Sequence, residues 1–539
     1  MCDQMPISRP DPELTGSPVP DAATEPSTGV LKKHFVLKGE TSLDGLADHL
    51  SASFNTVCRF IKRETLALYD THVWTLWHEG LLLVQSRSRL TLQKRAGDWP
   101  DGEAVASLPL KGTCPHLARD FPPSELQRVL CKRLGYRALH KVGKLYTHHI
   151  EWDLRDSSQK VVVRLRISES PQPKVNLLFV EVVPLTGYDR EAHAAGELLA
   201  AVSEPEAAGP LQGAFSSEEP DPVPYMLKPE FEFSPTAETR AVLCEVALKT
   251  LGIARFNERG TVQDWDTEFL HDLRISLRRI RSVLGSIKEV FPERELQEWK
   301  EVLGTISRHT NQVRDLDVYL LSRHEMTELL PAELQDGLDR FFDDLSHQRK
   351  TAFRKLRAYL KSAKYREKMQ YLEQAFSNPG KLPEMKHGMA PIRQQAANRL
   401  AKRLRQLTRL AKELEVDAPD DAIHEIRIAG KKLRYLLEFF GKLFPDREVA
   451  ALTRSLGKLQ RQLGEFNDTS VQQAYLLKYA AAEARIQEPR IAMSLGGLIA
   501  VIARKHQSLK RKVGEKLDQL SSSADVENFR KMIARYQSR

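Results

Sequence analysis

Two helical stretches carry the residues with the clearest chemical potential. The first holds four basic side chains three or four positions apart, which we call the first basic stripe: His271, Arg274, Arg278 and Arg281. The second basic stripe has the same spacing: His424, Arg427, Lys431 and Arg434. These spacings place each set on one face of a helix, where like charges repel one another. Such a face is stabilised best by an external polyanion.

The two stripes are copies within a longer repeat. Residues 271–318 align without a gap to residues 424–471 at an offset of 153, with 14 identities in 48 positions. This pattern predicts a tandem duplication of a unit of about 150 residues, with pseudo-twofold symmetry between the copies. Four further basic residues belong to the same candidate site, two beside the stripes and two upstream at the shared offset: Arg279, Lys432, Arg240 and Arg393.

The residue types in the stripes favour a ligand made of phosphates. Arginine binds phosphate oxygens in a bidentate manner and lysine acts as a point charge. Base readout would need amide or aromatic side chains among the cations, and Tyr435 alone offers one there. Non-specific nucleic-acid binding stays open as an alternative, because backbone contacts need no bases. A basic face without a ligand is a second alternative, and a metal site at the two histidines is disfavoured by the surrounding arginines.

The charge of the chain is divided unevenly. The 539 residues carry a net charge of +9, but residues 1–235 have a net charge of −5 and residues 236–539 one of +14. The basic half therefore predicts a polyanionic partner. Five scattered cysteines indicate reduced thiols rather than disulfides or a zinc site. We find no apolar run long enough to span a membrane, and residues 1–29 lack the apolar core of a signal peptide, so we expect a disordered tail and a cytoplasmic protein.

The pattern of elements predicts two domains. Short β-rich runs at 34–37, 81–84, 89–92, 161–165 and 177–183, with helices near 43–60 and 123–134, predict an antiparallel sheet or barrel over residues 30–205. An acidic, proline-rich linker over 206–235 follows. From residue 236 to residue 539 the apolar residues recur at helical spacing, and prolines fall mostly between the predicted helical stretches. These stretches are 238–255, 266–290, 295–308, 312–330, 334–376, 390–414, 420–444, 449–464, 469–485 and 491–520. This pattern predicts an all-α domain of helical bundles.

The stripe helices resemble a known family. HDLRISLRRIR (271–281) and HEIRIAGKKLRY (424–435) are similar to the signature helices of the CHAD domain, the conserved histidine α-helical domain, as are residues 312–320 and 459–476. The resemblance covers about 300 residues and implies two four-helix bundles around a basic channel that binds inorganic polyphosphate. It implies that both stripes line this channel together with Arg279 and Lys432, with Arg240 and Arg393 as weaker candidates.

Residues 30–205 are more weakly similar to the CYTH domain of the triphosphate tunnel metalloenzymes. The resemblance rests on the triplets at 69–71, 90–92 and 180–182. Such enzymes need carboxylates for a divalent metal and cations for triphosphate. The ExExK signature of the family falls on residues 34–38, where Lys38 alone matches, and the later glutamate pair keeps Glu181 but has Val183. Neutral residues stand at three positions where the family has cations: Val84, Ser86 and Gln93.

The resemblances together imply one function and leave an alternative. The missing carboxylates imply an N-terminal α+β barrel that has lost its metal and its catalysis, so we expect no catalytic residue, no cofactor and no metal. We expect the C-terminal domain to bind inorganic polyphosphate without catalysis and to target the protein to polyphosphate-containing granules, with no membrane partner. A metal-dependent triphosphatase in the N-terminal domain is the alternative.

Overall fold

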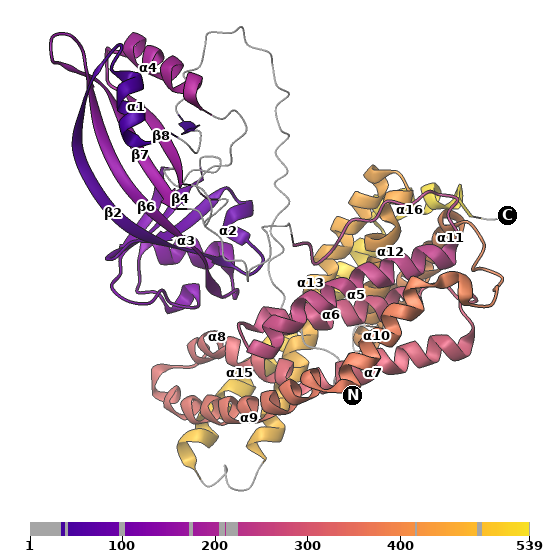
Figure 1. Cartoon of the computed structure of the whole chain (residues 1–539). Coiled ribbons are helices and arrows are strands. Elements are labelled where there is room, and N and C mark those ends of the chain that lie inside the picture. Colours follow the sequence, from indigo (N-terminus) through magenta and orange to yellow (C-terminus); the bar gives the residue numbers. More distant parts are fainter. Residues whose placement is uncertain are drawn as a thin grey trace. The chain divides into compact units, whose positions relative to one another are not determined.

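The computed structural model describes residues 34–37, 41–95, 103–171, 176–203, 211, 225–415, 418–481 and 488–537. The predicted tail at 1–29, Lys38 and nearly all of the predicted linker before Tyr225 lie outside these residues. The chain divides into two compact units, Gly16–Tyr225 and Met226–Arg539, which are described separately (Figure 1). The predicted linker residues 226–235 therefore belong to the C-terminal unit, where Phe231 is buried in the helical core.

The N-terminal unit is built on one antiparallel sheet of eight strands, in the order β1-β8-β7-β6-β2-β3-β4-β5. The strands are β1 (His34–Leu37), β2 (Asn55–Thr71), β3 (Leu81–Gln85), β4 (Arg89–Lys94), β5 (Ala104–Pro109), β6 (Leu139–Arg155), β7 (Val161–Pro171) and β8 (Asn176–Pro184). Because β1 and β5 are the two edges of this order, the described strands form an open sheet. The predicted closed barrel is not found among them.

Local signals explain where the helices of this unit begin and end. Helix α1 (Leu43–Leu50) starts after Ser42, whose hydroxyl accepts a hydrogen bond from the Gly45 amide at 3.0 Å. The helix predicted over 43–60 is too long, because β2 begins at Asn55 and pairs along its length with β6. Helix α3 (Glu125–Leu134) ends at Gly135, which has a positive φ of 56°, as the glycine there predicts.

The two faces of the sheet differ in chemistry. On β6, β7 and β8, the buried residues Trp152, Leu165 and Val182 form a core with α1 and α4 (Asp189–Val202). The remaining helices, α2 (Thr75–His78) and α3, contribute to a second core with β3, β4 and β5. Strand alternation places charged side chains on the face opposite the first core.

The charged residues on that face form a row across the strands. Arg166 of β7 contacts Glu151 of β6 at 3.5 Å and Glu181 of β8 at 3.4 Å. Glu151 also lies 3.7 Å from Arg59 of β2. We call these four residues the sheet charge row. Each carboxylate in it faces at least one guanidinium, so the row neutralises itself.

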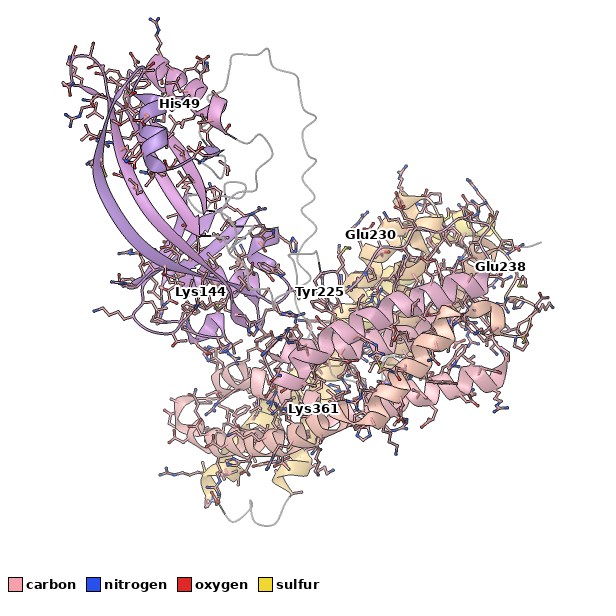
Figure 2. All side chains as sticks on the ribbon, viewed as in Figure 1. His49, Lys144, Tyr225, Glu230, Glu238 and Lys361 are labelled. Carbon is pink, nitrogen blue, oxygen red and sulfur yellow. The ribbon has the colours of Figure 1, made fainter. Side chains whose placement is uncertain are left out.

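The C-terminal unit is helical, as the periodicity predicts. Its α-helices are α5 (Thr239–Gln263), α6 (Thr267–Leu284), α7 (Glu293–Leu321), α8 (Arg323–Glu328), α9 (Asp336–Lys361), α10 (Ala363–Ser377), α11 (Ile392–Lys412), α12 (Asp420–Phe440), α13 (Asp446–Ala480), α15 (Pro489–Ser521) and α16 (Ala524–Ala534). An extended segment that includes Glu230 leads into α5 (Figure 2), and Glu230 pairs with Lys442 at 3.1 Å. No described helix of the chain is long and apolar enough to cross a membrane.

The sequence repeat reappears in the order of the helices. Four pairs of helices begin at positions 153 residues apart: α5 and α11, α6 and α12, α7 and α13, and α9 and α15. Some predicted stretches merge, since 449–464 and 469–485 fall largely within the single helix α13. One predicted stretch divides, because Ser362 separates α9 from α10 and caps the second helix by accepting a hydrogen bond from the Tyr365 amide.

Candidate anion-binding site

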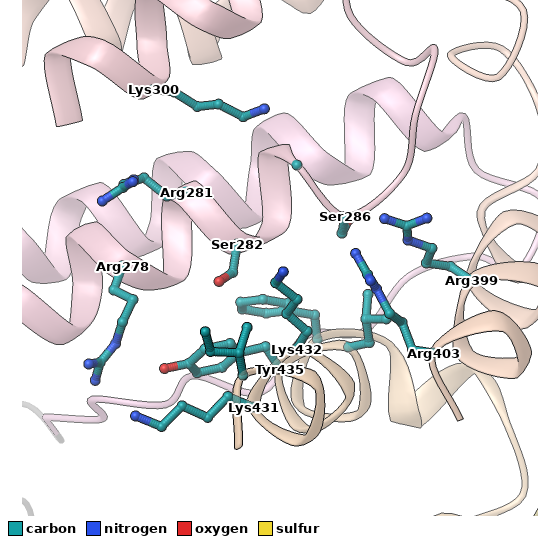
Figure 3. A pocket seen from close by; sticks show the side chains of 14 residues that line it. Arg278, Arg281, Ser282, Ser286, Lys300, Arg399, Arg403, Lys431, Lys432 and Tyr435 are labelled. Carbon is teal, nitrogen blue, oxygen red and sulfur yellow. The ribbon is translucent and has the colours of Figure 1, made fainter. Parts of the chain in front are cut away.

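A cavity of about 450 Å³ opens between four helices of the C-terminal unit (Figure 3). Seven basic side chains line it: Arg278 and Arg281 from α6, Lys300 from α7, Arg399 and Arg403 from α11, and Lys431 and Lys432 from α12. The other lining residues are Ser282, Gly285, Ser286, Ile428, Tyr435, Leu436 and Phe439. None of these described lining residues is acidic. We call this cavity the cationic pocket.

The apolar faces of the two stripe helices fix the position of the cations. On α6, Leu273, Ile280 and Leu284 are buried in the core, and Asp266 caps the helix by accepting hydrogen bonds from two amides of the first turn. On α12, Gly430 allows close packing against α13, because a Cβ there would lie 2.1 Å from Nε2 of Gln460. With the opposite faces held in the core, two basic residues of each helix turn towards the cavity: Arg278 and Arg281 on α6, and Lys431 and Lys432 on α12.

Burial and mutual repulsion lower the pKa values of three basic side chains in the pocket. Burial lowers the pKa of Lys431 well below its usual value, and the neighbouring Arg278, Arg427 and Arg434 lower it further. Burial lowers the pKa of Arg399 to about 10, with Arg403 adding to the effect. The pKa of Lys432 falls for the same two reasons. A bound anion would reverse these shifts, because it replaces repulsion by attraction.

Four of the sequence-predicted site residues meet in this pocket. Arg278 and Arg281 come from the C-terminal half of the first basic stripe, and Lys431 comes from the second. Lys432, predicted as a flanking residue, also lines the cavity. Figure 3 shows the lysines of α12 and the arginines of α6 and α11 extending into this space from different helices. Residues of both stripe helices therefore meet at one cavity.

The N-terminal halves of the stripes are engaged within the protein. Arg274 donates hydrogen bonds to the Ser307 carbonyl, to Oγ1 of Thr310 and to Oδ1 of Asn311, all on α7. Nδ1 of His424 lies 3.2 Å from Oδ1 of Asn467 on α13. His271 is half-buried, and neither histidine is among the residues that line the cationic pocket. The C-terminal half of the first stripe thus faces the cavity, whereas Lys431 is the one residue of the second stripe that lines it.

The remaining predicted residues also have protein partners. Arg427 is buried, and burial lowers its pKa while the nearby Asp468 opposes the shift. Arg240 donates hydrogen bonds to the carbonyls of Leu382 and Pro383 at 2.8 and 3.2 Å. The guanidinium of Arg393 lies 5.2 Å from the ring centre of Tyr536. None of these three arginines lines the cationic pocket.

Glu438 of α12 holds the last two predicted residues. It accepts a hydrogen bond from Arg279 at 2.9 Å and lies 3.4 Å from Nε of Arg434. The Arg279 side chain is 1% exposed, so this ion pair is buried between α6 and α12. The pair with Arg434 joins two residues one turn apart on α12. The pair with Arg279 links the two repeats.

Sequence reasoning missed three cations of the pocket. Arg399 and Arg403 lie one turn apart on α11, a helix with seven basic residues and no acidic residue over 392–412. This lack of acids was a usable signal, because solvated helices ordinarily interleave both charges. Lys300 has no comparable signal, since acidic residues surround it in the sequence of α7.

Two of the predicted tunnel residues in the N-terminal unit are enclosed within its sheet. Glu181 pairs with Arg166 within the sheet charge row, and Val84 is buried. In the part of the chain that the structure describes, no group of three or more His, Cys, Asp or Glu residues is placed to hold a metal ion.

A family model described as CHAD domain matches residues 245–477, so this region of the chain is a CHAD domain. The match includes both stripe helices and all seven cations of the pocket. Two Mycobacterium tuberculosis proteins that are described as uncharacterized are also similar. Rv2226, of strain H37Rv, is 26% identical over 223 residues, and MT2285, of strain CDC 1551, is 24% identical over 216 residues. Each alignment covers 40% of this chain and 40% of the relative, so the chain spans less than half the length of these relatives.

Two solved structures resemble the chain at low identity. The CHAD domain of the plant Ricinus communis has 20% identity and a TM-score of 0.44, over 57% of this chain and 95% of that one. PptA from Streptomyces chartreusis has 18% identity and a TM-score of 0.40, over 53% of this chain and all of that one.

Proposed function

We propose that the cationic pocket binds inorganic polyphosphate without catalysis. One observation carries the proposal: seven basic side chains from four helices surround one cavity that no lining carboxylate neutralises. The presence of a CHAD domain, a family linked to polyphosphate binding, supports the same ligand. A linear chain of phosphates presents oxygens on every side, which suits cations that approach from several helices.

The proposal changes the set of ligand residues expected from the sequence in two ways: it adds three cations, and it gives part of each stripe a different role. Arg278, Arg281, Lys431 and Lys432 remain ligand residues in the proposal, and Lys300, Arg399 and Arg403 join them. We assign the N-terminal halves of the stripes a supporting role, because they hold α6 and α12 against α7 and α13. In this proposal the two repeats are related by pseudo-twofold symmetry, and the pocket lies where their stripe helices meet.

A competition assay tests the proposed ligand. The full-length protein should bind fluorescently labelled long-chain polyphosphate, and the affinity should fall steeply with salt as counterions are released. Unlabelled polyphosphate should displace the label at much lower phosphate concentration than single-stranded RNA does. Equal displacement by RNA at equal phosphate concentration would favour general nucleic-acid binding and overturn the proposal.

The N-terminal unit enters the proposal as a degenerate CYTH-like domain without catalysis. The self-neutralised sheet charge row supports this assignment, because a triphosphate site needs cations that remain available. Incubation with tripolyphosphate and magnesium or manganese should release no phosphate above the buffer control. Metal-dependent release would restore the triphosphatase alternative.

Polyphosphate binding would also direct the protein to polyphosphate-containing granules. A fluorescent fusion of the full chain should coincide with granules, and a variant with alanine at Arg278, Arg281, Arg399 and Arg403 should not. Coincidence that survives in this variant would separate localisation from the cationic pocket.

A further inference from the structure

The two sides of the paired stripe helices are unequal. Arg281 and Lys432 line the cationic pocket, whereas their equivalents 153 residues away, Arg434 and Arg279, are held by Glu438. The three cations that complete the pocket have uncharged equivalents: Val246 for Arg399, Thr250 for Arg403 and Thr453 for Lys300. These five pocket cations therefore lie on one side of the paired helices, whereas their equivalents on the other side are uncharged or paired with Glu438.

Glu438 is the residue that marks this difference. Its equivalent in the first repeat is Gly285, which lines the pocket and has no side chain to neutralise a cation. The Glu438 carboxylate lies 2.9 Å from Arg279, 3.4 Å from Arg434 and 3.8 Å from Lys228. Three cations thus surround one carboxylate that is largely shielded from solvent.

The carboxylate acts on a phosphate chain in two ways. It repels a phosphate placed beside it, and this repulsion is strong where burial reduces screening. It also pairs with Arg434, which is partly exposed, and so competes with phosphate oxygens for that guanidinium. A repulsive element of this kind sets specificity, because it penalises one mode of binding without weakening the other.

We infer that Glu438 limits the length of phosphate chain that the protein contacts. The bound chain then occupies the side formed by Arg281, Lys432, Arg399, Arg403 and Lys300, and it ends its contacts at Arg278 and Lys431. This inference rests on the proposed function, since it concerns the same ligand in the same pocket. It assigns Glu438 as a specificity-determining residue for chain length.

Chain length is therefore the variable to measure. Isothermal titration calorimetry of the full-length protein, with tripolyphosphate and with size-fractionated polyphosphates of increasing length, gives an affinity for each chain. For the unaltered protein the affinity should rise with length and then level off once the pocket is filled. In Glu438→Gln, Arg434 no longer pairs with a carboxylate, so the affinity should keep increasing to greater chain lengths. The longest chains should bind this variant about tenfold more tightly than they bind the unaltered protein.

Matched variants separate this effect from a general change of charge. Glu425→Gln removes an exposed carboxylate from the same helix and should leave the length dependence unchanged. Arg434→Gln alone should also change little, because Glu438 already neutralises Arg434. In the double variant with Glu438→Gln, the loss of Arg434 should cancel most of the gain for long chains.

Each outcome decides between the inference and the proposed function. If the unaltered protein binds no polyphosphate of any length, the proposed function fails. If it binds but Glu438→Gln levels off at the same length and affinity, only the role of Glu438 is wrong. Should Glu438→Gln fail to fold, Arg434→Gln decides alone: a loss for long chains as large as that of Arg281→Gln would overturn the inference.

Discussion

The sheet charge row of the N-terminal unit and the cationic pocket of the C-terminal unit use the same side chains in opposite ways. In the row, Arg59 and Arg166 alternate with Glu151 and Glu181 across neighbouring strands, and each charge finds its partner within the protein. In the pocket, seven cations face one another across a cavity without a lining carboxylate. The number of arginines on a surface therefore says less about a ligand than the placement of the acids among them.

The contrast has a physical origin in the two kinds of element. Register in a sheet sets residues of adjacent strands directly opposite one another, where a pair of opposite charges stabilises and a pair of like charges does not. Helices α6 and α12 are held together by their apolar faces, so their basic faces can remain close although they repel. Hydrophobic burial elsewhere offsets that repulsion, so several cations can share a cavity that no lining carboxylate neutralises.

The largest effect should follow from removing the pocket cations. Alanine at Arg278, Arg281, Arg399 and Arg403 should weaken polyphosphate binding by roughly 100-fold or more, because each charge-assisted hydrogen bond contributes about 1.5–3 kcal/mol. Binding would be measured by calorimetry, with circular dichroism to confirm the helical content. Alanine at Arg164 and Arg166 in the sheet is the matched control and should leave binding unchanged. Equal losses in both variants would erase the distinction between the two regions.

A smaller effect should follow from giving the pocket an acid of its own. Ser282→Asp places a carboxylate among the cations and makes the pocket resemble the sheet charge row. We expect a loss of roughly tenfold in affinity, since the new charge both pairs with the cations and repels phosphate. Ser282→Asn has a similar shape without the charge and should bind almost as the unaltered protein does. Comparable losses in the two variants would indicate a steric effect instead.

The affinity of the pocket should also fall as the pH rises. Because the pKa of Lys431 is lowered, this lysine loses its charge at a pH where an ordinary lysine keeps it. Asp468 interacts electrostatically with Lys431, and burial raises the pKa of Asp468 to about 7. Asp468 therefore becomes negatively charged as the pH rises through that value. Both changes make the site less positive. The expected change is several-fold in affinity between pH 6 and pH 9.

Calorimetry in buffers of different ionisation enthalpy would measure the associated proton uptake. A bound polyanion raises the pKa of Lys431, so binding near neutral or alkaline pH should take up protons. Lys431→Met should reduce that uptake and flatten the pH profile. Affinity that increases with pH would contradict this account of the pocket.

The smallest effect is expected in the sheet charge row itself. Glu151→Gln removes one of its acids, and because exposed ion pairs contribute about 0–1 kcal/mol, the free energy of unfolding should fall by no more than that. Polyphosphate binding should not change. Thermal denaturation compares this variant with Glu125→Gln, which removes an exposed carboxylate of α3. A gain in polyphosphate affinity would show that the row, once unpaired, behaves as a second anion site.

The repeat made the C-terminal unit predictable to the level of individual helices. Stripe helices predicted over 266–290 and 420–444 are observed as α6 and α12, with their apolar faces buried as expected. The cavity itself was not predictable in full, because helical periodicity describes one helix at a time. That Arg399 and Arg403 of α11 face Lys432 of α12 depends on packing between helices.

The division of the stripes had no signature in the stripe sequences. Arg274 and His424 look like the other stripe residues, and only the polar residues of α7 and α13 decide that they face a neighbouring helix. In the N-terminal unit, short β-rich runs identified the sheet but not its long strands β2 and β6, whose polar residues obscure the alternation. Whether such a sheet closes depends on pairing between its edge strands, and no local pattern reports it.

The buried pair between Arg279 and Glu438 joins the two stripe helices through a contact within the protein. The cations of the cationic pocket are therefore kept close in the empty protein, and their repulsion opposes folding. A ligand that binds only the folded state stabilises it by about 2.7 kcal/mol at a concentration 100 times its dissociation constant. If the proposed function holds, polyanion binding would therefore add to the stability of the folded chain and lengthen the time that each molecule survives proteolysis.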